Sequence, residues 1–219
     1  AIVTFDSTTG DLRREVDIQR ELMRLKSGDI AYGHLHATGS VRDFFCGDGI
    51  VSYFILRDPR DVVVSHVYYV TEIETNHVHH QYYQEELANF DERLKTSILG
   101  RPDFGSLFPN IRERLDPYLG WFDLPQVLVL RFEDFAFERR KTIRRIFNHA
   151  VECGFPTLLD DHQAIEMLSA GINPENSPTF RKGEVGGWIA KFSPENKQLF
   201  NDVAGDLLIQ LGYEQSNDW

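Results

Sequence analysis

The stretch VSYFILRDPRDVVVSHVYY, residues 51–69, decides how the rest of the chain is interpreted. Its first six residues are apolar and rich in β-branched and aromatic side chains, which predicts a buried strand. Asp58 is a good N-cap and Pro59 suits the first helical position, so we expect a helix to begin there. Arg57 would then lie at the carboxyl end of a strand, where open α/β sheets bind ligands, and Ser65 about two helical turns further on.

A guanidinium and a hydroxyl at a strand–helix junction suit a phosphate group, because arginine offers planar paired donors. The same Arg-Asp-Pro-Arg-Asp sequence also fits a salt-bridged corner with a purely structural role. A second stretch, TFRKGEVGGWIAKF at residues 179–192, combines adjacent cations with three glycines. Glycine lets backbone approach a ligand closely, so this composition is typical of a phosphate-binding loop, although alone it also fits a basic surface loop.

Together the two stretches resemble the motifs of the sulfotransferases that use 3′-phosphoadenosine 5′-phosphosulfate as the sulfuryl donor. Arg57 and Ser65 are similar to the 3′-phosphate motif of that family, and the run from Arg181 to Phe192 is similar to its C-terminal motif. The resemblance covers the chain from about residue 34 to residue 192. It implies that the nucleotide is bound by Arg57, Ser65, Phe132, Arg181, Lys182 and the Gly183 backbone, with Gly186 or Gly187, Trp188 and Phe192 completing the second motif.

Two aromatic residues allow either a nucleotide contact or a purely structural role. Phe132 resembles a family position that lies near the adenine, ahead of a Glu-Asp pair, but it also fits a core residue at the end of a strand. Trp188 fits packing of the C-terminal loop better than contact with the nucleotide.

Sulfuryl transfer also needs a base that takes the acceptor's proton, and histidine suits that task near neutral pH. The resembling family has a catalytic histidine in a His-Leu-Pro segment at a strand end, just over twenty residues before the arginine. His34-Leu35-His36 fills that place, which implies that His34 is the general base, with His36 as the alternative. From the residues alone, each histidine also fits a hydrogen-bonded structural role.

One family feature has no counterpart before His34, namely the Pro-Lys-Ser-Gly-Thr loop whose amides and lysine hold the 5′-phosphosulfate. Residues 7–10, Ser-Thr-Thr-Gly, lack the lysine, and residues 26–28 close a predicted helix instead of opening one. We therefore expect residues 1–219 to form a single sulfotransferase domain without this N-terminal segment, and the natural polypeptide to carry the loop upstream of Ala1.

The order of strands and helices predicts an α/β fold with a central parallel sheet flanked by helices, and no repeat or linker divides the chain. The resemblance implies the same sheet, related to the P-loop nucleotide kinases. Further strands are expected at residues 30–35 and 127–132. Helices are expected at residues 11–26, 41–45, 82–99, 110–121, 137–153 and 161–170, with a last one that begins at residues 193–195 and ends near residue 212.

Composition excludes several classes of protein. A net charge of −11 argues against a nucleic-acid binder and against a strongly anionic polysaccharide acceptor. Two cysteines without a CxxC pattern fit a reducing, cytoplasmic location and no metal site, and His77, His79 and His80 fit a polar loop or helix face better than a metal centre. No apolar run is long enough to span a membrane, while a signal or anchor upstream stays possible.

The favoured function is transfer of a sulfuryl group from 3′-phosphoadenosine 5′-phosphosulfate to a hydroxyl or amine of a small or lipid-like acceptor, which leaves 3′-phosphoadenosine 5′-phosphate. The alternative is a non-catalytic nucleotide-binding or scaffold module. A P-loop or protein kinase is disfavoured because the GxxxxGK[ST] and GxGxxG patterns are absent. We expect the acceptor pocket to be built from residues 71–83 and 104–122, which are rich in aromatic side chains and histidine. Neither the acceptor nor the oligomeric state follows from the sequence.

Overall fold

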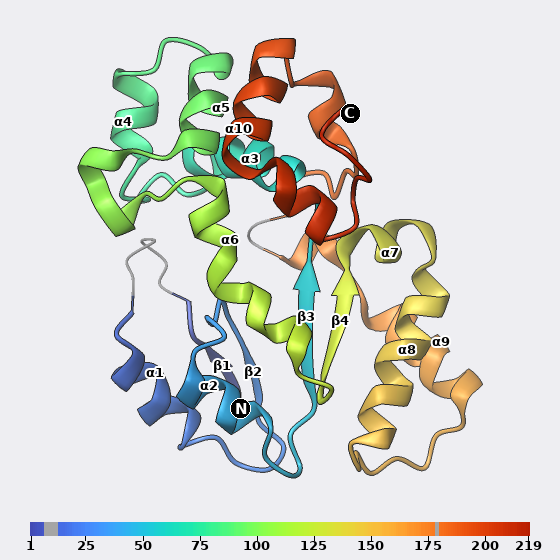
Figure 1. The fold of residues 1–219 in the computed structure, drawn as a ribbon. Coiled ribbons are helices and arrows are strands. Elements are labelled where there is room, and N and C mark those ends of the chain that lie inside the picture. The colour runs from blue at the N-terminus through green and yellow to red at the C-terminus, as the bar shows by residue number, and fades with distance from the viewer. Residues whose placement is uncertain (7–12, 178–179) are drawn as a thin grey trace.

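The structure is a computed structural model that describes residues 1–6, 13–177 and 180–219, with the backbone alone at residues 105 and 106. It begins with a strand–helix–strand unit (Figure 1). β1 (Ile2–Thr4) pairs in parallel with β2 (Ile30–Tyr32), and α1 (Glu15–Leu22) connects the two strands. The sequence did not predict β1, and the first residues of the expected helix at 11–26 lie outside the described residues.

The stretch at residues 51–69 folds as its sequence predicts. β3 (Ser52–Leu56) is followed at once by α3 (Pro59–Tyr68), and the Asp58 side chain caps that helix by accepting a hydrogen bond from the backbone N–H of Arg60. β3 pairs in parallel with β4 (Val127–Arg131), with Leu56 opposite Arg131. The carboxyl ends of β3 and β4 therefore meet at one edge, as a ligand site in an α/β fold requires.

The strands form two separate two-stranded parallel sheets in the described part of the chain, β1–β2 and β3–β4, where the sequence predicts one central sheet. The α/β class and the parallel pairing hold, but most of the chain is helical. The apolar run of β3 predicts cover on both faces, yet Tyr53 and Ile55 remain 39% and 55% exposed. An apolar run identifies a strand, but it does not identify the strand's neighbours.

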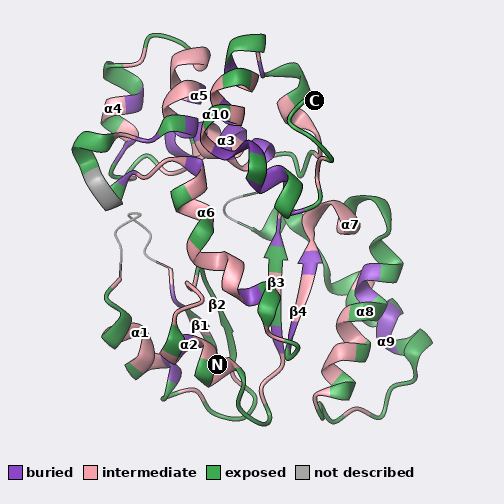
Figure 2. Cartoon of the chain, viewed as in Figure 1, coloured by how far each residue is buried: buried purple, intermediate pink, exposed green. Residues whose placement is uncertain are grey.

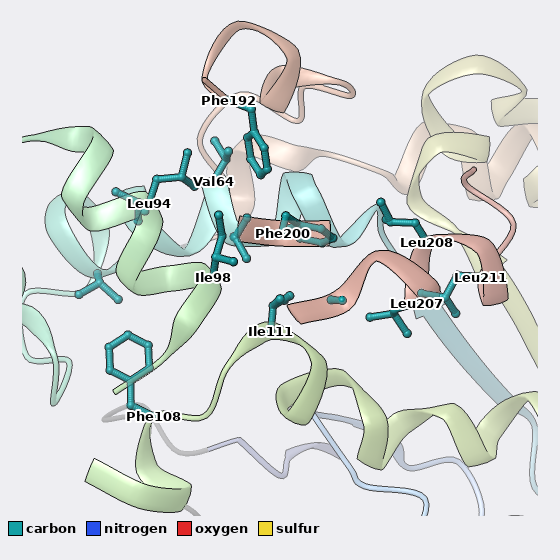
Figure 3. Close-up of a cluster of buried hydrophobic side chains, with 14 of the residues drawn as sticks. Val64, Leu94, Ile98, Phe108, Ile111, Phe192, Phe200, Leu207, Leu208 and Leu211 are labelled. Carbon is teal, nitrogen blue, oxygen red and sulfur yellow. The ribbon is translucent and has the colours of Figure 1, made fainter. Parts of the chain in front are cut away.

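The larger hydrophobic core lies among the helices beyond the ends of β3 and β4. It is enclosed by α3, α5 (Phe90–Leu99), α6 (Ile111–Leu119) and α10 (Pro194–Gln210). Figure 2 shows that α3 is largely buried, and Figure 3 shows the side chains of α5 and α10 gathered around Phe200. A smaller core cluster consists of Phe5, Leu22, Val41, Trp121 and Val127, and it supports the β1–β2 unit.

Two expected helices differ from the sequence interpretation. The helix expected at residues 82–99 is divided into α4 (His80–Glu85) and α5, because Asn89 caps α5 by accepting from the N–H of Glu92. The helix expected at residues 137–153 is preceded by α7 (Phe132–Phe137), which starts directly after β4. The remaining elements are α2 (Gly39–Phe45), η1 (Tyr69–Ile73), η2 (Pro102–Leu107), η3 (Gly120–Asp123), α8 (Arg139–Glu152), α9 (Asp161–Gly171), η4 (Pro174–Asn176) and η5 (Gly187–Ala190).

Across the three described ranges, no helix combines the length and the hydropathy that a membrane crossing requires.

Candidate functional site

Arg57 lies where β3 ends and α3 begins, and it contacts two distant parts of the chain. Its Nη2 donates a hydrogen bond to the carbonyl of Glu184 over 2.6 Å, and its guanidinium lies 4.7 Å from the centroid of the Phe132 ring. Its Nε is buried without a hydrogen-bond partner among the described residues. Buried donors are normally paired, so this N–H lacks a partner that a ligand oxygen would supply, which fits the phosphate contact that the sequence predicts.

Asp61 ties the glycine-rich loop to α3. Its carboxylate accepts hydrogen bonds from the backbone N–H groups of Gly186 and Trp188, over 2.8 and 3.0 Å, and lies 3.8 Å from the Arg57 guanidinium. Burial raises the pKa of Asp61, and the two N–H groups and the Arg57 charge offset part of that rise. The sequence interpretation missed this residue, although Asp61 stands four positions after Arg57, the spacing of neighbours on one helix face.

Ser65 and Arg181 meet α3 further along the helix. Ser65 is half-buried and lies three positions before Tyr68, so the two share one face of the helix. The guanidinium of Arg181 stacks over the Tyr68 ring, 3.8 Å from its centroid. The structure therefore brings the cation of the second motif to the helix that carries the serine of the first.

Lys182 and Gly183 lie on the exposed part of the same loop. Gly183 has φ of +60°, a left-handed conformation that favours glycine, and an added Cβ would lie 3.0 Å from the Phe180 ring. Lys182 forms no hydrogen bond or ion pair with the described residues, so its amine is free to meet an anion.

Trp188 is half-buried and packs against the larger hydrophobic core, as its sequence position favours. The buried guanidinium of Arg60 lies 3.9 Å from the Trp188 ring and 4.6 Å from the Trp219 ring. Arg60 also pairs with Asp58 and with Glu214 near the C-terminus. The turn that carries Arg57 is thus fixed by η5 and by the segment that follows the last helix.

His34 lies just beyond the carboxyl end of β2 and is 82% exposed. Its Nδ1 lies 3.0 Å from an Asp6 carboxylate oxygen, and its backbone N–H donates to the same oxygen over 2.5 Å. The hydrogen bond of the His34 ring to the Asp6 carboxylate raises the pKa of His34, although partial desolvation opposes it. The sequence interpretation assigned no role to Asp6.

His36, the alternative base, has a different environment. Its ring meets the edge of Tyr118, with the centroids 5.0 Å apart. Burial, together with the charge of His34, lowers the pKa of His36. His36 therefore faces an aromatic side chain where His34 faces a carboxylate.

The two segments expected to form the acceptor pocket contact each other. The His79 ring stacks on Phe108 with centroids 4.0 Å apart, and its Nε2 lies 3.1 Å from the carbonyl of Leu107. Burial lowers the pKa of His79 to about 4, so this imidazole is neutral at physiological pH. Tyr118, which also belongs to the second segment, contacts the ring of His36.

Within residues 1–6, 13–177 and 180–219, no group of three or more His, Cys, Asp or Glu side chains is placed to hold a metal ion. The segment at residues 7–10, which the sequence interpretation weighed and rejected as a phosphosulfate loop, lies outside the described residues, between β1 and α1.

The family model described as "Sulfotransferase domain" matches residues 50–212 of the chain. Among curated proteins, a 3-alpha-hydroxysteroid sulfotransferase of Cavia porcellus is 22% identical over 179 residues, 74% of this chain and 57% of that protein. Cytosolic sulfotransferase 5 of Arabidopsis thaliana is 23% identical over 178 residues, 73% of this chain and 52% of that protein. The chain thus spans little more than half the length of these relatives.

Solved structures show the same fold. Mouse sulfotransferase SULT7A1, crystallised with PAP, matches with a TM-score of 0.61 and 15% identity over 94% of this chain and 83% of that one. Retinol dehydratase, crystallised with androsterone and the inactive cofactor PAP, matches with a TM-score of 0.57 and 20% identity over 86% and 56%.

Proposed function

The chain belongs to the sulfotransferase domain family, and from that premise we propose that it binds 3′-phosphoadenosine 5′-phosphosulfate and transfers its sulfuryl group to a hydroxyl or amine of a small or lipid-like acceptor. The observation that carries the proposal is the meeting of two stretches more than 120 positions apart, through the Arg57–Glu184 hydrogen bond. A sequence motif alone does not require such a meeting.

Each nucleotide-binding residue has a role that its position supports. Arg57 presents the buried Nε to the 3′-phosphate, and Ser65, Arg181, Lys182 and the Gly183 backbone are its further partners. Charge-assisted hydrogen bonds of this kind are short and strong, and arginine provides two in one plane. Phe132 lies beside Arg57 at the carboxyl edge of β4, and in this proposal its ring contacts the adenine.

His34 acts as the general base in this proposal. The acceptor oxygen forms the new bond to sulfur while the bond from sulfur to the bridging phosphate oxygen breaks, and His34 takes the acceptor's proton. The nucleotide leaves as 3′-phosphoadenosine 5′-phosphate. The exposure of the His34 ring supports this role, because an acceptor must reach it.

Steroid substrates in the names of two relatives, and androsterone and retinol in complexes of a structural neighbour, suit a small apolar acceptor for this chain as well. The aromatic contacts between residues 71–83 and 104–122 support a site of that character. The name of a cytosolic relative supports the cytoplasmic location that the two cysteines favour.

The test of this function is turnover with labelled donor and a panel of small hydroxyl acceptors, for the wild type, His34→Ala and His36→Ala. We expect His34→Ala to lose about 10²–10⁴-fold in rate, with unchanged affinity for 3′-phosphoadenosine 5′-phosphate. Loss of turnover in His36→Ala alone would move the base to His36. Tight nucleotide binding without turnover, in the wild type as in the variants, would favour the non-catalytic module.

A further inference from the structure

We propose that Asp6 positions and polarises His34, so that the two form a carboxylate–imidazole pair in which Nε2 is the atom that accepts the proton. This inference rests on the proposed function for its catalytic meaning, but the pairing itself is independent of it. Asp6 is a positioning residue in this proposal, because it acts through His34.

One carboxylate oxygen of Asp6 fixes both the ring and the backbone of His34. It lies 3.0 Å from Nδ1 and accepts the backbone N–H over 2.5 Å. With the carboxylate on Nδ1, the neutral ring carries its proton there and leaves the lone pair on Nε2. The ring is 82% exposed, so Nε2 can be reached by an acceptor.

The surrounding chain holds Asp6 in place. Asp6 lies two positions after the end of β1. The preceding residue, Phe5, accepts a hydrogen bond at its carbonyl from Nη1 of Arg13, over 3.2 Å. Gly33 permits the close approach of the two segments, because a Cβ at this position would lie 2.8 Å from Cβ of Phe5. A larger residue in place of Gly33 would therefore push the Asp6 segment away from His34.

The charged and titratable groups around the pair leave Asp6 as its anion. Arg13 and His34 lower the pKa of Asp6, against the effect of its burial. Burial raises the pKa of the phenols of Tyr69 and Tyr118, and the nearby Asp6 charge adds to this rise. Both phenols are therefore neutral near pH 7. His36 is also neutral there, since its pKa is lowered. Asp6 is thus the group that can stabilise a positive His34.

The chemical consequence is a stronger and better oriented base. As the acceptor's oxygen bonds to sulfur, its proton moves to Nε2, and the imidazolium that forms is stabilised by the Asp6 carboxylate. Removing the carboxylate that orients a metal-binding histidine typically costs about 10–100-fold in activity, and we expect a loss of the same order for this pair. Because Asp6 raises the pKa of His34, the acid limb of the pH–rate profile should lie at a higher pH than it would for a histidine without this partner.

The experiment is a titration of the His34 ring by NMR in the wild type, Asp6→Asn and Asp48→Asn, with the His34 signal assigned by its loss in His34→Gln. Asp48 is an exposed carboxylate outside the pair and serves as the matched control. We expect the His34 midpoint to fall in Asp6→Asn and to stay in Asp48→Asn. In a turnover assay, kcat of Asp6→Asn should fall about 10–100-fold with its acid limb moved to lower pH.

A second measurement needs no variant. Long-range ¹H–¹⁵N correlation on the wild-type chain reports the tautomer of His34, and the pair predicts a proton on Nδ1 above the midpoint. An unchanged midpoint in Asp6→Asn, or a proton on Nε2 in the wild type, would overturn the pairing. A shifted midpoint combined with full turnover in His34→Ala would leave the pairing intact and overturn only the catalytic role assigned to His34.

Discussion

The two regions that carry the proposed chemistry are built very differently. The junction around Arg57 is tied to the rest of the chain by buried groups, among them Asp61 and Arg60, and it lies on the larger hydrophobic core. The segment around His34 lies beyond a two-stranded sheet of short strands, on the smaller core, and is held by one partly exposed carboxylate. The proposed nucleotide site is therefore supported by many buried contacts, whereas the proposed base is held by few.

The largest effect on stability is expected from a substitution in the larger hydrophobic core. Phe200 is fully buried at the centre of the larger core (Figure 3), and Phe200→Ala should lower the free energy of unfolding by about 3–5 kcal/mol. Ile209 lies on the same helix, is 41% exposed and serves as the matched control. Ile209→Ala should change the free energy of unfolding by less than about 1 kcal/mol. Chemical denaturation of both variants measures this, and equal losses would show that the core is not centred on Phe200.

A smaller effect concerns the tie between α3 and the loop. In Asp61→Asn one of the two loop N–H groups faces an amide NH₂ instead of an oxygen, so we expect a loss of about 1–3 kcal/mol. Hydrogen exchange should quicken at the amides of Gly186 and Trp188. Asp206→Asn, at a 76% exposed carboxylate paired with Arg112, should cost at most about 1 kcal/mol. Unchanged exchange in Asp61→Asn would mean that the loop is held by other contacts.

The smallest effect on stability is expected at the His34 segment. Asp6→Ala removes an exposed pair and should lower stability by no more than about 1 kcal/mol. The pKa of His34 is raised and the pKa of Asp6 is lowered in the folded protein. The contribution of the pair to stability is therefore lost as pH rises through the pKa of His34, and also as pH falls through the pKa of Asp6. It should be greatest between about pH 4 and pH 6.5. Thermal unfolding across that window measures it, and a loss that grows above neutral pH would contradict the pairing.

The same contrast explains how far sequence alone could go. The junction is local in sequence: an apolar strand, an Asp-Pro cap and a helix are each written in adjacent residues, so residues 51–69 could be predicted closely. The Asp6–His34 pair joins residues 28 positions apart, and no periodicity marks it. The same holds for the partners of β2 and β3. Strand pairing and long-range hydrogen bonds depend on tertiary packing, which a local pattern does not contain.

Within the proposed binding site, the resemblance identified Arg57 and the loop at residues 180–192, which the structure places against the same helix, α3, but it did not identify what holds them there. Arg57 and Arg181 follow from their motifs, whereas Asp61 and Arg60 serve the site by fixing backbone and turn. Such supporting residues carry no ligand-binding signature, because an aspartate or arginine near a helix start also fits an ordinary ion pair.

The most direct test of the central claim, that the two distant stretches form one nucleotide site, is calorimetric titration of 3′-phosphoadenosine 5′-phosphate into the wild type, Arg57→Ala and Arg181→Ala. Arg140→Ala is the control, since Arg140 is an exposed arginine that pairs with Glu166 on the far α8–α9 hairpin. We predict that Arg57→Ala and Arg181→Ala each lose about 1.5–3 kcal/mol of binding free energy, while Arg140→Ala binds as the wild type does. Unchanged affinity in both site variants would contradict the account.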